Sequence, residues 1–282
     1  MDQQIDLHMH SAASDGTDNP AQLVENIQKA GIRTFALTDH DTIDGCSQVE
    51  ALVPPALRFI RGVEFSCITS AGKCHILGYG YRPEAPSIHQ ALEVGRVLRQ
   101  AKLNRRLDHL EKVHGIRFSE EELRWLAGLN SPGKPHLAQL ILDRGLADTR
   151  EEAITRYING CKGGDTRIDG AIAVRGILGA GGIPVLAHPL GGEGEPHLTR
   201  ERFNAQLTVL LGLGIQGLEC CYSRYTREEV AFLLDQAEKH GLLVSGGSDY
   251  HGTAKDIPLG TLNAFGDRVP EETLTILTRL KK

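Results

Sequence analysis

Two histidines lie one residue apart near the start of the chain, His8 and His10. If residues 4–10 form a strand, side chains two positions apart share a face, so both imidazoles point the same way while Leu7 and Met9 point to the other face. Neutral imidazole is the commonest metal ligand in proteins, and a strand holds such a pair rigidly. A lone His-x-His is frequent by chance, so its value depends on similar residues elsewhere in the chain.

Later apolar runs end in the same kinds of side chain. The runs at 34–38, 57–63, 183–187, 215–218 and 242–245 lead into His40, Glu64, His188, Glu219 and Asp249 with His251, while His75 lies near the start of a run at 74–79. In a parallel barrel the carboxyl ends of the strands converge on one face, where such folds carry their chemistry. Seven side chains are therefore expected to meet in space, namely His8, His10, His40, Glu64, His188, Asp249 and His251. Asp39 is interpreted as a turn or cap residue.

Helical patterns alternate with these runs. Pro20 follows the possible caps Asp18 and Asn19, and helical spacing then continues to Gly31. A second helix at 226–240 opens with a capping box and is closed by a glycine. With 282 residues, of which 40% are hydrophobic, the chain can bury the core of a single α/β barrel.

One long stretch, from residue 83 to about 164, interrupts this alternation because it is helical throughout. One or two helices are expected at 87–114, and further helices after a capping box at Ser119 and Glu122, at 135–143 and at 149–158. The sequence therefore predicts a metal-binding barrel from 1–82 and 165–282, with 83–164 inserted as a helical cap subdomain.

Two features of the insert suit an anion. Four cations step by three, three and four residues along one helix face, which is either solvated or a phosphate clamp: Arg96, Arg99, Lys102 and Arg106. The turn at 131–136 feeds a helix start and presents backbone N–H groups beside Lys134 and His136. The alternative is a simple turn with His136 on the surface.

Charge and composition exclude several partners. The chain has 31 basic and 36 acidic residues, a net charge of -5, so no global attraction to duplex nucleic acid or an anionic membrane is expected. The six cysteines include no C-x-x-C pair, the first residues are too polar for a signal peptide, and no apolar run is long enough to span a bilayer. We expect a reduced, cytoplasmic protein.

Six motifs together resemble the PHP (polymerase and histidinol phosphatase) family, in the order found there. They are Asp6-Leu7-His8-Met9-His10-Ser11 with Ser14-Asp15-Gly16, Thr38-Asp39-His40, Gly62-Val63-Glu64, His75-Ile76-Leu77-Gly78-Tyr79, Ala187-His188-Pro189 and Gly247-Ser248-Asp249-Tyr250-His251. The insert and its Gly-Lys-Pro-His stretch further resemble stand-alone PHP phosphoesterases acting on nucleoside 3',5'-bisphosphates and, in some members, short 5'-phosphorylated RNA. Lys134 stands where many relatives have Arg, which keeps the charge but loses the bidentate fork.

The resemblance implies a distorted (β/α)7 TIM-like barrel with two or three divalent ions. Carried over, the first metal is held by His8, His10, Glu64 and Asp249, the second by Glu64, His75 and His188, and the third by Asp15, His40 and His251. Asp15 and His75 have no independent support beyond lying near a strand end. Mixed nitrogen and oxygen ligands suit Mn²⁺, Zn²⁺ or Fe²⁺, and the family favours Mn²⁺.

The implied function is metal-dependent hydrolysis of the 3'-phosphate of nucleoside 3',5'-bisphosphates to a 5'-mononucleotide and phosphate, with trimming of short 5'-phosphorylated oligoribonucleotides as a further activity. A metal-bridged hydroxide would attack phosphorus without a phosphoenzyme. The residues expected to be catalytic are His8, His10, Glu64, His188 and Asp249, and those expected to hold the second phosphate are Lys134, His136 and Arg224.

Three rival functions stay open. A histidinol-phosphate phosphatase is the nearest, and a non-catalytic PHP module that binds metal and nucleotide is the most different. An amidohydrolase shares the His-x-His opening, but the sequence offers no clear metal-bridging lysine at a mid-barrel strand end. The 5% aromatic content gives few stacking platforms for long single strands, which favours mononucleotides or short oligomers as partners.

Overall fold

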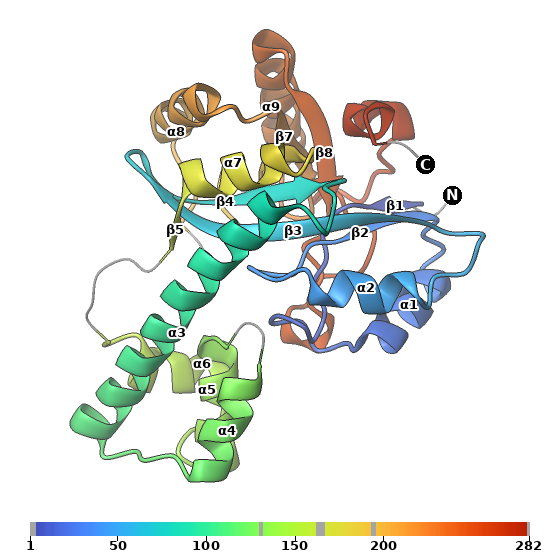
Figure 1. Cartoon of the computed structure of the whole chain (residues 1–282). Coiled ribbons are helices and arrows are strands. Elements are labelled where there is room, and N and C mark those ends of the chain that lie inside the picture. Colours follow the sequence, from blue (N-terminus) through green and yellow to red (C-terminus); the bar gives the residue numbers. More distant parts are fainter. Residues whose placement is uncertain (1–3, 130–131, 162–166, 193–195, 281–282) are drawn as a thin grey trace.

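A computed structural model describes residues 4–129, 132–161, 167–192 and 196–280. Its described strands form one eight-stranded sheet in the order β1-β2-β3-β4-β6-β7-β8, with β5 paired to β3 (Figure 1). The strands are β1 Ile5–Asp6, β2 Thr34–Leu37, β3 Arg58–Thr69, β4 Gly72–Tyr79, β5 Ile168–Asp169, β6 Ile183–Leu186, β7 Gly217–Tyr222 and β8 Leu243–Gly247.

The sheet curls until its two edges meet. Beyond the last residue of β1, the His8 carbonyl accepts from the Asp249 N–H at 2.8 Å, and the His10 N–H donates to the Tyr250 carbonyl at 2.8 Å. Earlier in the same segment the Leu7 N–H donates to the Gly246 carbonyl at 3.2 Å. The seven-strand path is therefore a nearly closed barrel, and the predicted fold class is confirmed.

One strand, β4, departs from the expected parallel arrangement. β4 runs antiparallel to both β3 and β6, whereas every other described strand pair is parallel. Because β4 runs the opposite way, its beginning lies at the mouth where the other strands end. This places His75, an early residue of β4, beside the ends of its neighbours.

Helices flank the barrel (Figure 1). They are α1 Pro20–Lys29, α2 Asp44–Glu50, α7 Gly170–Gly179, α8 Arg200–Leu213 and α9 Arg227–His240, with short 3-10 turns at Gly252–Ala254, Glu271–Thr273 and Thr275–Thr278. α1 begins as predicted, since Asn19 caps it and Pro20 occupies its first turn, and it buries Leu23 and Ile27. The predicted capping box of α9 is also present.

A second group of helices forms a lobe beside the barrel (Figure 1). It comprises α3 Pro86–His114, α4 Glu120–Gly128, α5 Lys134–Asp143 and α6 Arg150–Ala153, which continues as a π-helical turn at Ile154–Ile158. The lobe has its own buried core, which includes Leu103, Leu110, Leu126 and Ile141. Of the described helices, none combines the length and apolarity needed to cross a membrane.

α3 connects the two parts, because its first half belongs to the barrel. Ala91 is buried in the barrel core, and the Ser87 hydroxyl donates to the Gly176 carbonyl of α7 at 3.1 Å. The predicted division at 83–164 stays a prediction, since its second boundary falls within residues 162–166, outside the described residues.

The lack of a side chain at Gly247 allows the two edges of the barrel to lie close together. A Cβ at this position would lie 2.3 Å from the His8 backbone nitrogen, so Gly247→Ala must push β8 away from the first segment. We expect a loss of about 3 kcal/mol in the free energy of unfolding, measured by urea denaturation. The control is Gly212→Ala in α8, where a Cβ meets nothing within 4 Å and alanine should add about 0.5–1 kcal/mol. If Gly247→Ala leaves the free energy of unfolding unchanged, closure of the barrel does not depend on this glycine.

Candidate metal centre

Nine side chains predicted from the sequence lie together at one mouth of the barrel. Eight of them form three groups whose possible ligand atoms lie within 4.8 Å of one another: His8, His10, Glu64 and Asp249; His10, Asp15, His40 and His251; and His40, Glu64 and His75. The ninth, His188, joins through its Nε2, which lies 3.1 Å from Glu64 Oε1. We call these nine residues the mouth cluster.

The most deeply buried group surrounds the imidazoles of His8 and His10. Their Nε2 atoms lie 3.4 and 3.3 Å from Glu64 Oε2. The same two atoms lie 3.5 and 3.3 Å from Asp249 Oδ1. Four donor atoms from three separate segments therefore face one small volume, and His8 and His10 share a face as their alternate spacing predicts.

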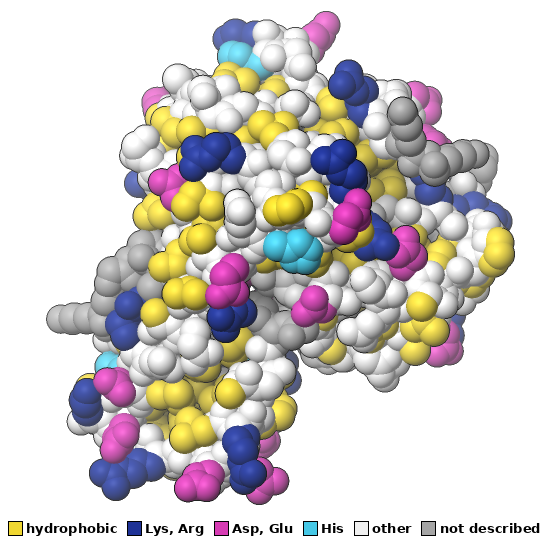
Figure 2. Space-filling view, viewed as in Figure 1, with side chains coloured by type: hydrophobic (Ala, Val, Ile, Leu, Met, Phe, Trp, Pro, Cys, Tyr) yellow, Lys and Arg dark blue, Asp and Glu magenta, His cyan; other side chains and the backbone are white. Residues whose placement is uncertain are grey.

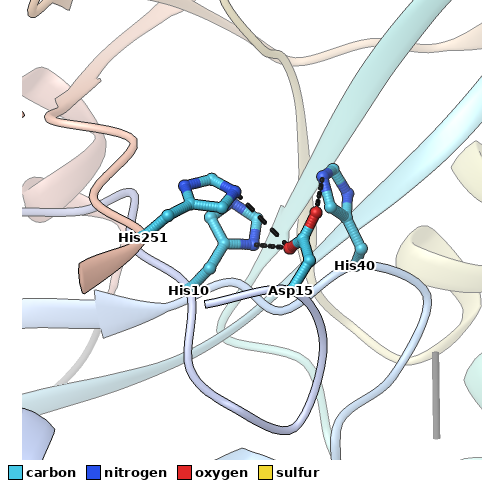
Figure 3. Close-up of side chains that lie close together, drawn as sticks. All are labelled: His10, Asp15, His40 and His251. Atoms are coloured by element: carbon cyan, nitrogen blue, oxygen red, sulfur yellow. Dashed lines mark ion pairs between the residues drawn. The ribbon is translucent and has the colours of Figure 1, made fainter. Parts of the chain in front are cut away.

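The second group is arranged around the carboxylate of Asp15. In Figure 3 this carboxylate lies between the rings of His10 and His251 on one side and that of His40 on the other. Asp15 Oδ1 is 3.4 Å from His251 Nε2 and 3.7 Å from His10 Nδ1, while Asp15 Oδ2 is 3.8 Å from His40 Nε2. Asp15 thus lies in the cluster, although its own sequence context gave little support.

Glu64 joins the groups because its two oxygens face different partners. Oε1 lies 3.0 Å from His75 Nδ1, and the same oxygen is the one near His188. Oε2 lies 3.1 Å from His40 Nδ1 and also faces the two N-terminal histidines. A carboxylate placed in this way can bridge two cations.

The buried polar atoms of the cluster fit bound cations. Five of the ten buried side-chain nitrogen or oxygen atoms that lack a hydrogen-bond partner within the described residues belong to it: His8 Nε2, both ring nitrogens of His10, His40 Nδ1 and Glu64 Oε2. An unsatisfied buried group costs about 1–3 kcal/mol, which a coordinated ion would offset. These mixed nitrogen and oxygen donors are consistent with several divalent ions, and they do not select one metal.

The charges of the cluster point the same way. Burial opposes ionisation of Glu64, yet the imidazoles of His40 and His8 outweigh it and hold the pKa of this carboxyl well below its usual range. The pKa values of Asp15 and Asp249 are likewise held low, against the effect of burial. Burial would lower the pKa of His10, but its carboxylate neighbours raise it to about 9. The carboxylates of Glu64, Asp15 and Asp249 therefore stay anionic, as ligands of cations must be.

Glu219 supports the cluster from behind, and the sequence gave it no role. This fully buried carboxylate lies at 2.9 Å from His8 Nδ1 through Oε1 and accepts the His188 backbone N–H at 2.7 Å through Oε2. The backbone of His188 has a φ of 24°, a strained value for a residue with a side chain. One carboxylate thus orients a histidine ring and holds a strained backbone, and its place at a strand end was the available signal.

Other partners outside the cluster fix its loops. Asp39, expected to be a turn or cap residue, is instead buried and accepts from the Ser11 N–H at 2.8 Å and the Ser14 hydroxyl at 2.6 Å. It therefore fastens the loop that carries Asp15. Asp249 Oδ2 accepts from the Tyr222 hydroxyl at 3.0 Å and from Lys255 Nζ at 2.8 Å, which leaves Oδ1 facing the histidines.

A pocket of about 210 Å³ adjoins the cluster at Asp15 and His40, and we call it the basic pocket. Its cationic lining consists of Arg99, Lys102, Arg106, Lys134 and Arg167. Arg99 is paired with Asp41, which also lines the pocket. On the face shown in Figure 2, basic and acidic side chains are interspersed, in contrast to the five cations that line this pocket.

Crowding of like charges is evident in this pocket. Burial, with a smaller effect from the charge of Arg167, lowers the pKa of Arg106 to about 10. Burial also lowers the pKa of Lys134, and Arg106 and Arg167 add to that effect. Cations forced together beside a cluster of metal-binding type are the arrangement expected for an anion site.

The residues predicted to hold a second phosphate are placed differently from one another. Lys134 lines the basic pocket and donates to Asn159 Oδ1 at 2.5 Å. His136 Nδ1 accepts the Gly133 N–H at 3.1 Å, and among the described residues neither His136 nor Arg224 lines this pocket. Their roles stay predictions, and the Ser131 of the predicted turn lies outside the described residues.

The helix face predicted from charge spacing is partly turned toward the pocket. Arg99, Lys102 and Arg106 line it, whereas Arg96 is mostly exposed and bonds to Glu93 at 2.7 Å. Three of these four cations are thus placed for anion contact.

Comparison with known proteins places these features in a family. The family model for the PHP domain matches residues 6–161. The chain is 28% identical over 251 residues to a 3',5'-nucleoside bisphosphate phosphatase of Chromobacterium violaceum, covering 88% of this chain and 87% of that protein. It is 30% identical to a 5'-3' exoribonuclease of Haemophilus influenzae, covering 92% and 94%. A solved structure of an amidohydrolase from Chromobacterium violaceum, with sulfate and no metal bound, matches with a TM-score of 0.81 at 26% identity, covering 98% and 95%.

Replacing Glu219 tests its supporting role. A glutamine offers one acceptor where the His8 ring and the His188 N–H need two, so Glu219→Gln should lower Mn²⁺ affinity about 10- to 100-fold. Metal titration of the purified protein, with metal content as a second readout, measures this. Glu238→Gln, the same change on the exposed end of α9, should leave affinity unaltered. If both variants bind Mn²⁺ with equal affinity, Glu219 does not support the metal centre.

Proposed function

The chain belongs to the PHP domain family, and on this premise we propose that it hydrolyses the 3'-phosphate of nucleoside 3',5'-bisphosphates. It is a PHP metal-dependent phosphoesterase, and the finer substrate assignment is the proposal. The products would be a 5'-mononucleotide and inorganic phosphate. We further propose that short 5'-phosphorylated oligoribonucleotides are trimmed at the same bond. The names of two relatives, a bisphosphate phosphatase and a 5'-3' exoribonuclease, support these two substrate classes.

The observation that carries this proposal is the position of the basic pocket. It shares Asp15 and His40 with the mouth cluster, so an anion in the pocket lies next to a group held at the cluster. A nucleoside 3',5'-bisphosphate has two phosphates joined by one ribose. We propose that its 3'-phosphate lies at the cluster while Lys134 and Arg106 contact its 5'-phosphate.

The proposed chemistry uses the nine residues of the mouth cluster as ligands of two or three divalent ions, with Mn²⁺ favoured. Bound ions of this kind supply Lewis acidity and lower the pKa of a coordinated water. The reacting phosphate is oriented at the cluster by five residues, namely His8, His10, Glu64, His188 and Asp249. Glu219 keeps the His8 ring in place, and Tyr222 keeps the Asp249 carboxylate in place. The O3'–P bond breaks as the water oxygen bonds to phosphorus, and the 3'-oxygen receives a proton. The side chains at the cluster act as ligands, so the proposal includes no phosphoenzyme.

A substrate panel tests the proposal directly. The Mn²⁺-loaded protein should release phosphate from adenosine 3',5'-bisphosphate and leave adenosine 5'-monophosphate, and a 5'-phosphorylated dinucleotide should yield the same mononucleotide. Histidinol phosphate should be a poor substrate because it has no second phosphate for the basic pocket. Preference for histidinol phosphate would instead support that rival activity, and no turnover of any substrate would support a binding module.

Lys134 provides a sharper test of the second phosphate. Lys134→Ala removes one cation from the basic pocket, and loss of a charged hydrogen bond is worth about 1.5–3 kcal/mol. The KM for adenosine 3',5'-bisphosphate should therefore rise about 10-fold or more, while that for p-nitrophenyl phosphate changes little. Lys112→Ala, on the exposed end of α3 with 73% of the side chain accessible, is the matched control. A similar change in KM for both esters would show that Lys134 does not read the second phosphate.

A further inference from the structure

A second pocket reaches the mouth cluster from another side. It has a volume of about 330 Å³ and is lined by His188, whereas the basic pocket is lined by His40 and Asp15. The ring of His75 neighbours a lining histidine of each pocket, with its centroid 5.1 Å from that of His40 and 5.0 Å from that of His188. We call this second space the His188 pocket.

The walls of the His188 pocket come from three segments that are tied together. They are the tip of the β3–β4 hairpin, residues 187–191 and 196–198 after β6, and the start of α8. The buried Gln206 of α8 donates to the Lys73 carbonyl of the hairpin at 2.7 Å, and the Leu198 N–H donates to the Leu190 carbonyl at 2.9 Å. A cavity held in this way, within the usual ligand range of about 300–1,000 Å³, is suited to a specific occupant.

The lining combines apolar and basic groups. Pro189, Pro196 and Leu198 supply apolar surface, and Lys73 and Arg202 supply positive charge. Among the described residues, no aspartate or glutamate lines this pocket. Apolar walls with two cations suit a ligand with a flat apolar part and an anionic group, and a nucleotide has both.

The proposed reaction explains why such a ligand would lie there. In a bisphosphate, the phosphoryl group at the cluster carries only terminal oxygens besides the bond that breaks. In an oligoribonucleotide, one of those oxygens is the 5'-oxygen of the next nucleoside. The first nucleotide is anchored by its 5'-phosphate in the basic pocket, so the remaining chain must leave the cluster by another route.

Resting on the proposed function, we infer that the His188 pocket receives the second nucleoside of a 5'-phosphorylated oligoribonucleotide, with Arg202 and Lys73 near the phosphate that follows it. Hydrolysis breaks the O3'–P bond of the first nucleotide, the water oxygen bonds to phosphorus, and the 3'-oxygen takes the proton. The shortened RNA keeps this phosphate as its new 5'-phosphate.

Charge removal in the His188 pocket tests this inference on the full-length, Mn²⁺-loaded protein. For Arg202→Ala, we expect kcat/KM for the 5'-phosphorylated trinucleotide pApApA to fall about fivefold, while the value for adenosine 3',5'-bisphosphate stays within about twofold. The salt dependence of trinucleotide cleavage should also weaken by about one phosphate contact, which a merely structural effect would not produce. Arg200→Ala is the control, because this exposed neighbour lies 4.6 Å above the Phe232 ring and outside the pocket.

A steric variant gives an independent readout. Ala71 lines the pocket from the hairpin tip, so Ala71→Trp should fill it and reduce trinucleotide cleavage at least as strongly while bisphosphate hydrolysis persists. If the wild-type protein hydrolyses the bisphosphate but not the trinucleotide, the pocket assignment and the proposed trimming of oligoribonucleotides are both wrong, and only the bisphosphate activity stands. If both variants change the two substrates equally or not at all, the pocket assignment alone is wrong. Absence of bisphosphate hydrolysis by the wild-type protein would overturn the proposed function itself.

Discussion

The buried carboxylate of Glu64 is the constraint on which the rest of the mouth depends. It has no exposed surface, and its two oxygens lie close to imidazoles on different sides. Burying an unpaired charge is costly, so the barrel must bring compensating groups to this point. Its backbone is fixed as well, since the Glu64 N–H donates to the Asp39 carbonyl and its carbonyl accepts the Asp41 N–H. Backbone pairing between neighbouring segments of the barrel and the chemistry of the mouth therefore meet at one residue.

Three residues around Glu64 have strained backbone conformations, which contacts with neighbouring residues stabilise. Asp41, His188 and Asp249 have positive φ values of 52°, 24° and 61°, and all three lie at the mouth. Such conformations persist where the surroundings over-determine them. At Asp249, Tyr222 and Lys255 supply side-chain contacts, and at His188 the backbone bond to Glu219 does the same. Residues behind the mouth cluster thus stabilise the strained backbone that positions its ligands.

Local sequence patterns predicted most residues of the mouth cluster, whereas its other features depend on contacts between residues far apart in the sequence. The alternation of His8 and His10, and polar residues after apolar runs, were sufficient to place most of the cluster. Strand direction leaves no trace in alternation, so the reversal of β4 was not foreseen, and His75 was predicted as a ligand through the family resemblance alone. The role of Glu219 depends on a partner 211 residues away, which no local motif contains. Helical spacing grouped four cations of α3, of which Arg99, Lys102 and Arg106 line the basic pocket and Arg96 does not, and it could not show what they face.

The unbroken course of α3 sets a limit on how this protein can vary. Its early residues are embedded in the barrel, its middle carries Arg99 and Arg106 into the basic pocket, and its end builds the core of the lobe. Because each residue of an α-helix advances by about 100°, one inserted or deleted residue before Arg99 would swing these guanidinium groups out of phase with the mouth. An insertion or deletion beyond Arg106 would leave these guanidinium groups in place but would rotate Leu110 out of the core of the lobe. The angular register of one helix therefore preserves the alignment of two cores.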